Sequence, residues 1–525
     1  MADFDIVVIG AGSNSLTAAA YMAKAGQKVL VLEKNAQAGG GAISINIAPG
    51  FTSDPHATGL IICLTNPAMS SNELPLQENG LELIPFDASF SSIFEDGSGI
   101  ISYSDIDQTC ASIAKISVRD AEAYRRITNE SLALLPMLGR SMGAPPLPFS
   151  GFVGMLEQSP SGRRMVTDML NSVYDVIEEN FETVEVKLHL MKWCSESMMN
   201  PETKGTGLTF HMLLAIAHAH KACCVKGGTK NLTNALIGCV KQFGGEVRLE
   251  AEVKRVLVSG GKSVGVELTT GETIKARNGV IACIHPHRLG DYIKEIDPGI
   301  ADAARRVHLS DHGAINQQIA LKVAPEYKAG HEYKNVMCVE LMHKDMREAR
   351  EQFRNYVMGD MDLKKLSPLV MVNSNVDPSR APPGQAALYL YHFGPREWAN
   401  GGISAWEERG QEVADAIWED MKRYCTNMDD NAIIARHVET PLTHHRHSNS
   451  MMLGDIFGIG GSVSQMLGRR PIPELSGYRV PGIESLYLSG PFMHPGGAIT
   501  LGGRATAMAM CQDLKIDLKR AFTVI

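Results

Sequence analysis

The sequence lacks several features that would each narrow its class. It has no excess of positive charge, since the formal net charge is −8, so a nucleic-acid partner is not expected. Its ten cysteines are scattered without a Cys-x-x-Cys pair, a usage typical of a reduced compartment rather than of a disulfide framework or a zinc site. No uninterrupted apolar run approaches the ~18 residues of a membrane-spanning helix. No signal segment precedes the strand pattern that begins at residue 4, so a cytoplasmic protein is expected.

The composition that is present is that of an ordinary globular protein. The chain has 525 residues, of which 44% are hydrophobic and 21% are charged. This length gives room for two or three domains, or for two interleaved ones.

The clearest pattern occupies residues 4–33. An apolar run leads into a glycine turn, an alanine-rich helix pattern and a second apolar run that ends at Glu33. Gly10 allows a tight exit from the strand, and Gly12 has no side chain to keep a pyrophosphate off the amides of the helix N-terminus. Ser15 stands where the usual third glycine would be, and Glu33 is placed to accept from ribose hydroxyls. The pattern predicts a dinucleotide without a 2′-phosphate, FAD or NAD; the alternative is a tight turn without a ligand.

Two further glycine clusters indicate a close approach of backbone to a ligand. Three consecutive glycines at 39–41 contribute nothing to a core and cost backbone entropy, so a flat or phosphorylated ligand explains them better than packing does. A second cluster, at 490–503, lies between an expected strand at 484–488 and an expected helix at 503–514. Such a helix N-terminus favours the negative charge of a reduced flavin.

The stretches between these clusters predict a second, mixed region. Four helices are expected at 106–115, 118–135, 161–181 and 184–195, and four strands at 314–322, 335–341, 368–374 and 386–393. Polar and apolar residues alternate in 386–393, which predicts a sheet with one face toward a cavity. The segment 132–156 is apolar, nearly uncharged and interrupted by proline and glycine. It is either a lid that makes peripheral membrane contact or a loop packed on the core. Metal ligation by the histidines at 444–447 is not favoured, because no acids stand at ligand spacing.

Several stretches carry a resemblance to a known family. They are LEKNAQAGGGAISINIAPGF (32–51), TCASIAKISVRDAEAYRR (109–126), DPSRAPPGQAALYLYHF (377–393) and RRPIPELSGYRVPGIESLYLSG (469–490), with HPGG at 494–497. In these the chain resembles the phytoene desaturase-like FAD-dependent oxidoreductases. The similar branch is that of the ketolase-type carotenoid oxygenases and of pyridine nucleotide-disulfide oxidoreductase domain-containing protein 2.

The resemblance implies an α/β fold, in which a Rossmann-like FAD-binding domain with a β-meander is interleaved with an α+β substrate domain. The FAD-binding domain is expected over 1–70, 226–300 and 480–525, and the substrate-binding domain over 71–225 and 301–479. The implied cofactor is FAD, with contacts from Gly10, Gly12, Ser13, Asn14, Ser15, Glu33, Lys34, Gly40, Gly41, Ala42, Val253, Gly490, Gly496, Gly497 and Ala498. Ala42 departs from the arginine that often follows the glycines in the family, and Val253 is the implied adenine contact.

The expected function is that of an FAD-dependent dehydrogenase or desaturase, which oxidises a largely apolar small molecule by hydride transfer to flavin N5. His494 is the first candidate for a catalytic group because it precedes the flavin-loop glycines, and His56 is the second. The alternatives are a redox-neutral double-bond isomerase, a ketolase or an amine oxidase on the same fold, and a non-catalytic flavoprotein interaction module. The expected partners are an apolar substrate and an electron acceptor that no motif specifies; no oligomeric state is predicted.

Overall fold

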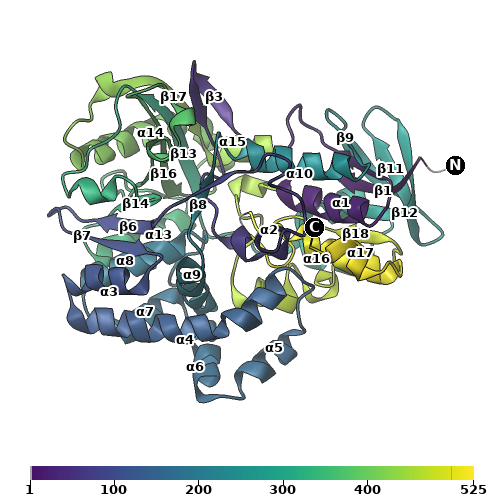
Figure 1. Ribbon diagram of the computed structural model, residues 1–525, viewed down its shortest axis with the longest axis horizontal. Helices are drawn as coiled ribbons and strands as arrows, with labels where there is room; N and C mark the ends of the chain where they lie inside the picture. The colour runs from purple at the N-terminus through teal and green to yellow at the C-terminus, as the bar shows by residue number, and fades with distance from the viewer. Residues whose placement is uncertain (1–2, 498, 525) are drawn as a thin grey trace.

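Two seven-stranded sheets lie in opposite halves of the molecule. The computed structural model describes residues 3–497 and 499–524. Strands β1 and β12 of the first sheet are at the right of Figure 1, and strands β13 and β16 of the second sheet are at the left.

The first sheet combines a parallel core with an antiparallel meander. Its parallel strands have the order β18, β12, β1, β2, β9, and β11 and β10 extend the sheet from β12. The strands are Phe4–Ile9 (β1), Val29–Leu32 (β2), Glu246–Arg248 (β9), Val253–Ser259 (β10), Lys262–Leu268 (β11), Thr273–Ala282 (β12) and Leu486–Leu488 (β18). Residues 273–275 of β12 pair with the meander, whereas residues 276–282 pair with β1. One long strand therefore joins the two parts.

Three helices pack on the first sheet: α1 (Ser13–Lys24), α10 (Lys230–Gln242) and α16 (Gly503–Asp513). Helix α1 is almost wholly buried, which its alanine-rich sequence permits because short side chains allow neighbouring helices to approach closely. A Cβ at Gly503 would lie 1.7 Å from the Asn14 carbonyl oxygen. Gly503 is thus required for the contact between α16 and α1, which lie side by side in Figure 1.

The second sheet has the strand order β17, β13, β16, β15, β14, β6, β7. Its strands are Ala88–Ile93 (β6), Gly99–Tyr103 (β7), Gly313–Leu321 (β13), Cys338–Leu341 (β14), Leu369–Met371 (β15), Ala386–Gly394 (β16) and Ile433–Glu439 (β17). Two strands from the first fifth of the chain thus complete a sheet built mainly from residues 313–439. Helices α13 (Met346–Val357) and α14 (Trp406–Arg423) lie in the same half of the molecule as the second sheet. The expected α/β class, with a doubly wound sheet, a β-meander and an interleaved α+β region, is confirmed.

Helices fill the region between β7 and β8 (Cys223–Val225). They are α3 (Ile106–Ala114), α4 (Val118–Met142), α5 (Phe149–Leu156), α6 (Pro160–Leu170), α7 (Val173–Asn180), α8 (Val184–Ser195) and α9 (Gly207–Ala219). The prediction of a single helix over 161–181 is wrong, because α6 ends before Asn171 and a new helix, α7, begins after Ser172. The Ser172 hydroxyl accepts from the Asp175 amide at 3.1 Å and the Asp175 carboxylate accepts from the Ser172 amide at 2.8 Å, which caps the new helix.

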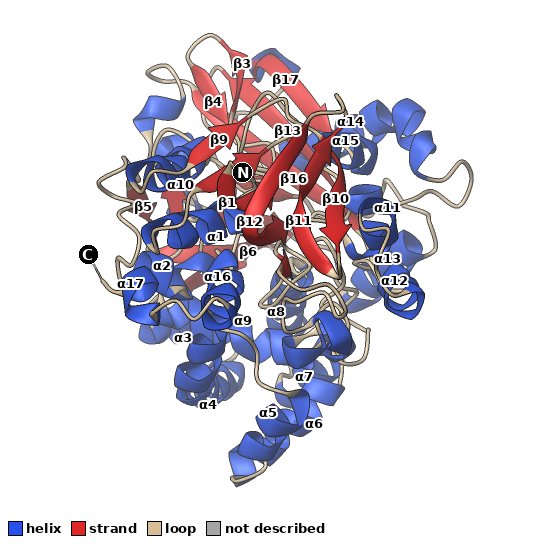
Figure 2. Cartoon of the chain, turned by 90° about the vertical axis from the view of Figure 1, so that its right-hand side faces the viewer, coloured by secondary structure: helices blue, strands red, loops and turns tan. Residues whose placement is uncertain are grey.

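The apolar segment 132–156 is largely helical rather than a loop. Helix α4 continues through Pro136 to Met142, beyond the expected end at residue 135, and α5 follows. The side chains of 134 and 137–141 lie outside the described residues; of the others, Leu147 and Met155 are exposed, whereas Phe152 and Leu156 are buried. Helices α5 and α6 project below the strands in Figure 2. Contact of this segment with a membrane stays a prediction.

The helices of the described chain, over 3–497 and 499–524, include none that is both long enough and apolar enough to cross a bilayer.

A buried ion cluster ties separate stretches of the chain together. The Arg380 Nη1 lies 2.7 Å from Asp54 Oδ2, and its Nε lies 3.1 Å from Asp377 Oδ2. Arg380 also donates to the Val225 carbonyl at 2.6 Å. The three charged side chains are at most 2% exposed. Because Asp54 follows β4 (Phe51–Ser53) and Arg380 precedes β16, the cluster fixes the N-terminal segment against the second sheet.

Candidate functional site

The glycine turn after β1 leaves an open space at the N-terminus of α1. Gly10 has a φ of +86°, which favours glycine, but Gly12 has φ −72° and ψ 163°, angles that any residue adopts. No protein atom lies within 4 Å of the position that a Cβ on Gly12 would take. Neither backbone angle nor packing requires glycine there, so the space is suited to a ligand against the helix amides.

The carboxylate of Glu33 braces this turn. Its Oε2 accepts from the Ala11 amide at 2.8 Å, and its Oε1 accepts from the Asn35 amide at 3.0 Å. Glu33 is 7% exposed and lines the same cavity as the glycines. The side chain is therefore held at the end of β2, at the position expected for a ribose contact.

A second strip of glycine backbone lies directly beside the turn. The Gly39 amide donates to the Ala11 carbonyl at 2.9 Å, and a Cβ on Gly40 would lie 3.3 Å from the Gly12 Cα. A Cβ on Gly41 would meet only ordinary contacts, at 3.6 and 3.9 Å. The glycine cluster before Glu33 in the sequence and the one after it are thus in contact, and they border one open space.

The third glycine cluster forms the loop between β18 and α16. Gly490, Gly496 and Gly497 all have positive φ, and a Cβ on Gly496 would come within 2.2 Å of the Arg470 Nε. The loop is tied to α1, because the Asn14 Oδ1 accepts from the Gly502 amide at 2.8 Å. Residues far apart in the sequence thus meet at the N-termini of α1 and α16.

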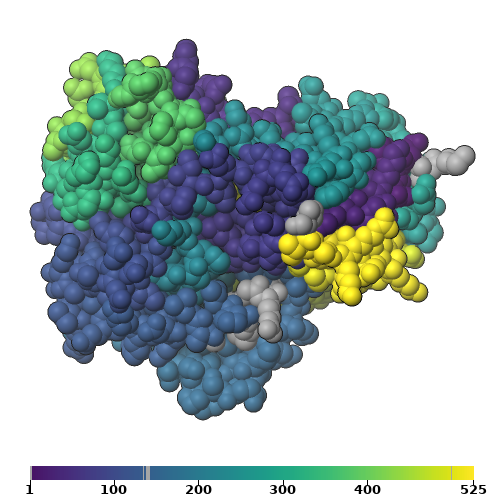
Figure 3. Space-filling model, in the orientation of Figure 1, coloured from purple at the N-terminus to yellow at the C-terminus, as the bar shows by residue number. Residues whose placement is uncertain are grey.

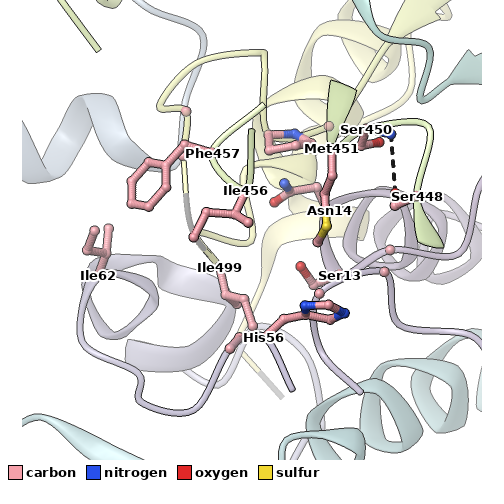
Figure 4. A pocket seen from close by; sticks show the side chains of 18 of the residues that line it. Ser13, Asn14, His56, Ile62, Ser448, Ser450, Met451, Ile456, Phe457 and Ile499 are labelled. Carbon is pink, nitrogen blue, oxygen red and sulfur yellow. Dashed lines mark hydrogen bonds between the residues drawn. The ribbon is translucent and has the colours of Figure 1, made fainter. Parts of the chain in front are cut away.

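All three clusters line one cavity of about 510 Å³, which is within the range of small-molecule and cofactor sites. Figure 4 shows part of its wall, with Ser13 and Asn14 near Met451, and His56 near Ile499. The cofactor-binding residues predicted from the sequence that line it are Gly10, Gly12, Ser13, Asn14, Ser15, Glu33, Lys34, Gly40, Gly41, Val253, Gly490, Gly496 and Gly497.

Two of the predicted residues are not part of this wall, and a third is not among the described residues. Ala42 is fully buried, and its carbonyl accepts from the Thr233 hydroxyl at 2.7 Å. His494 is buried, and its carbonyl accepts from the Tyr478 hydroxyl at 3.0 Å, but it is not among the lining residues. Ala498 lies outside the described residues. The catalytic role expected of His494 therefore stays a prediction without support from the cavity.

His56 does line the cavity, beside two histidines of α15 (Pro441–His447). Its ring centroid lies 5.3 Å from that of His444 and 4.8 Å from that of His447, whose Nε2 lies 3.1 Å from the Gly40 carbonyl oxygen. Burial lowers the pKa of His56 well below its ordinary value and that of His444 to about 4. Nowhere in the described chain do three His, Cys, Asp or Glu side chains converge as a metal site would require.

The cavity continues from the glycine clusters into an apolar wall. Tyr389 and Tyr391 of β16 line it with rings 6.0 Å apart, which confirms that the alternating 386–393 segment turns one face toward a cavity. Further contributors come from β6, α8, α9, the residue before β14, and β15: Phe90, Trp193, Met212, Leu213, Ile216, Met337, Leu369 and Met371. Apolar periodicity alone does not distinguish a filled core from a cavity wall.

A buried guanidinium lies behind the loop between β18 and α16. Arg470 is 2% exposed and donates to the carbonyls of Gly460 at 3.1 Å and Pro491 at 2.8 Å. Among the described residues its Nε has no hydrogen-bond partner, and no carboxylate lies within salt-bridge distance. Burial lowers the pKa of Arg470 to about 10, with the charge of Asp455 opposing the shift, so the side chain is cationic at neutral pH. Sequence reasoning missed this residue, because only the fold brings it to Gly496.

The residues present fit an FAD molecule. The open space at Gly12 forms a cradle of backbone that a side chain would fill, Glu33 stands at the ribose position, and the Arg470 cation lies behind the far loop. This arrangement defines a dinucleotide-binding protein with an apolar chamber beside the cofactor.

Comparison with known proteins gives the class. Residues 8–70 match the NAD(P)-binding Rossmann-like domain family, and residues 155–448 match the flavin containing amine oxidoreductase family. The chain belongs to the latter family and is an FAD-dependent oxidoreductase.

Similarity to individual proteins identifies the group of oxidoreductases within this class. The chain is 27% identical over 549 residues to a subunit of limonene dehydrogenase from Castellaniella defragrans, covering 98% of this chain and 95% of that one. It is 26% identical to pyridine nucleotide-disulfide oxidoreductase domain-containing protein 2 of Mus musculus (98% and 94%) and 25% identical to the lycopene-forming phytoene desaturase of Pseudescherichia vulneris (97% and 99%). It is thus a phytoene desaturase-like FAD oxidoreductase, as its sequence motifs indicated.

Solved structures share the fold. An oxidoreductase from Methanosarcina mazei superimposes with a TM-score of 0.62 at 15% identity, covering 97% of this chain and 99% of that one. Cyclohexylamine oxidase from Brevibacterium oxydans gives 0.60 at 15% identity, with 98% and 100% covered.

Proposed function

We propose that the protein is a dehydrogenase or desaturase that oxidises a largely apolar small molecule by hydride transfer to flavin N5. The observation that carries this proposal is the continuity of the cavity, in which the glycine clusters pass directly into a wall of aromatic, methionine and leucine side chains. Two relatives support it, because their names, limonene dehydrogenase and phytoene desaturase, describe the removal of hydrogen.

The chain's own contribution is to position the substrate and to exclude water. Bound FAD would supply the hydride acceptor. The Tyr389 and Tyr391 rings and the side chains of Trp193 and Met337 present apolar surface to the substrate, and burial in this wall removes water from the reacting bond. His56 lines the cavity beside Gly41, and burial lowers its pKa well below the ordinary value, so it is held there as a neutral imidazole.

The domain boundaries expected from the sequence form part of the proposal. Every strand of the first sheet falls within 1–70, 226–300 and 480–525, and every strand of the second falls within 71–225 and 301–479. This distribution supports an FAD-binding domain and a substrate-binding domain, with the chain crossing from one to the other four times.

A cytoplasmic location is also proposed. All ten cysteines, including the adjacent Cys223 and Cys224, are free thiols, which is the usage of a reduced compartment.

Anaerobic titration of the purified holoenzyme tests the proposed reaction. A panel of apolar hydrocarbons, alcohols and alkylamines is added, and the flavin absorbance is followed. At least one hydrocarbon or alcohol is expected to bleach the flavin. Conversion of a compound to an isomer without bleaching would identify a redox-neutral isomerase, and bleaching by alkylamines alone would identify an amine oxidase.

Replacing Arg470 by methionine is expected to make the flavin harder to reduce. The cation stabilises the negative charge that develops on reduction, and its loss makes the two-electron midpoint potential about 30 mV more negative, equivalent to about ten-fold in the equilibrium constant. Spectroelectrochemical titration of the holoenzyme measures the shift. Arg469→Met is the matched control, because the neighbouring Arg469 is exposed and packs over Phe149. Equal potentials in the two variants would exclude Arg470 from this role.

A further inference from the structure

A cluster of three charged side chains interrupts the apolar wall of the cavity. Lys192 and Glu196 lie one turn apart at the end of α8, and Glu340 lies on β14. The Lys192 Nζ is 2.9 Å from Glu340 Oε2 and 3.6 Å from Glu196 Oε1. The Lys192 and Glu340 side chains are at most 1% exposed, whereas the Glu196 side chain is 26% exposed and lines the cavity.

Aromatic and titratable side chains from several elements face this cluster. From β16, the Phe393 ring lies 4.0 Å from the Lys192 Nζ, and Tyr389 and Tyr391 lie within electrostatic range of Glu196. From β14, the Cys338 thiol lies within electrostatic range of Glu196. The buried His312, His343 and His392 lie within electrostatic range of Lys192, and burial lowers the pKa of each, so these imidazoles are neutral. The pKa values of both tyrosines and of the thiol are raised by burial, so these groups are neutral.

The cluster holds one ammonium and two carboxyl groups. Its net charge is zero only when one of the two carboxyl groups is protonated. Burial raises the pKa of Glu196 well above its ordinary value, and the charge of Glu340 adds to the shift. Burial raises the pKa of Glu340 as well, but Glu340 is the closer partner of the ammonium and is therefore the better placed to stay ionised. Glu196 is therefore the protonated member, and it presents a neutral carboxylic acid to the cavity.

A pure hydrocarbon offers no partner to this acid. The Glu196 Oε1 is buried and faces the Lys192 Nζ at 3.6 Å, so the rest of the carboxyl is what the cavity exposes, and an apolar molecule that fills the cavity would strip water from it. A buried polar group left without a partner is unfavourable. A molecule with one suitably placed oxygen would satisfy the acid and keep its apolar contacts with Trp193 and Met337.

We infer that the cavity binds an apolar molecule carrying one hydroxyl or carbonyl oxygen, and that this oxygen hydrogen-bonds to the Glu196 carboxyl. The inference rests on the proposed function in one respect, because it takes the apolar wall as the place of the substrate. Glu196 is thus a specificity-determining residue within a site otherwise suited to hydrocarbons.

Binding of three matched probes to the anaerobic holoenzyme tests the inference. The probes are butylcyclohexane, 4-butylcyclohexanol and 4-butylcyclohexylamine, and binding is followed by the perturbation of the flavin absorbance. The alcohol is expected to bind about ten-fold more tightly than the hydrocarbon. Glu196→Leu should abolish this preference, while Glu196→Gln should keep most of it, because a neutral amide still forms hydrogen bonds.

Glu185→Leu is the control, since Glu185 lies in the first turn of the same helix and does not line the cavity. Flavin content shows that each variant is folded, and Glu196→Gln serves if Glu196→Leu does not fold. Equal binding of alcohol and hydrocarbon by the unaltered enzyme, tighter binding of the amine, or an alcohol preference that survives Glu196→Leu would each overturn the inference. Failure of the proposed reaction is distinguishable, because it would abolish bleaching by every compound without changing the ratio of affinities.

Discussion

Gly12→Val yields a folded protein that does not retain FAD. The space beside the Gly12 Cα contains no protein atom, so the new side chain meets no clash in the empty chain and its cost falls on the cofactor. An isopropyl group in a cradle shaped for backbone contact weakens binding by about 5- to 150-fold, from ~1–3 kcal/mol of overpacking. The ratio of flavin to protein after gel filtration measures the loss, and circular dichroism reports the fold.

Gly151→Val is the matched control for this experiment. Gly151 lies in α5, also has no atom within 4 Å of its Cβ position and does not line the cavity. The control should retain its flavin. Full flavin content in Gly12→Val would show that the cofactor does not lie against this turn.

Arg380→Met is expected to lower the free energy of unfolding by about 3–5 kcal/mol, because it leaves two buried carboxylates without a counter-charge. Asp54 and Asp377 are at most 1% exposed, and neither is able to reach water when the guanidinium is removed. Thermal or urea unfolding of the variant measures the loss. Since the cluster joins the N-terminal segment to the second sheet, the two halves are expected to unfold in separate transitions in the variant.

Arg248→Met serves as the comparison. Arg248 forms a bidentate pair with Glu272 at 2.6 and 2.7 Å, but both side chains are nearly half exposed. Exposed pairs contribute about 0–1 kcal/mol. A loss of the same size in both variants would contradict the assignment of Arg380 as the buried link between the two regions.

The cofactor end of the site was predictable from sequence because its determinants are local. The turn at Gly10 and Gly12 and the acid at Glu33 lie within one strand–helix–strand unit, whose geometry follows from backbone rules. The alternation in 386–393 likewise identified the face that lines the cavity. Fold class and cofactor therefore followed from short stretches of chain.

The polar groups of the chamber could not be predicted in this way. The raised pKa of Glu196 depends in part on Glu340, 144 residues later. Arg470 becomes part of the site because the fold places it against the loop at Gly496. The pattern of 161–181 suggested one helix because apolar spacing continued across the break, although the Ser172 and Asp175 capping pair was present in the sequence. Spacing within a segment reports burial, whereas function here depends on contacts between segments.

The joining of α1 to α16 has a consequence for how the enzyme is made. The yellow C-terminal residues in Figure 3 lie against the purple N-terminal ones, and Gly490 follows Gly10 by 480 positions. On the ribosome the first half of the cofactor cradle emerges long before the loop that completes it. The growing chain must therefore exist without its flavin until translation has nearly finished. FAD accordingly binds to the full-length polypeptide and not to the nascent one.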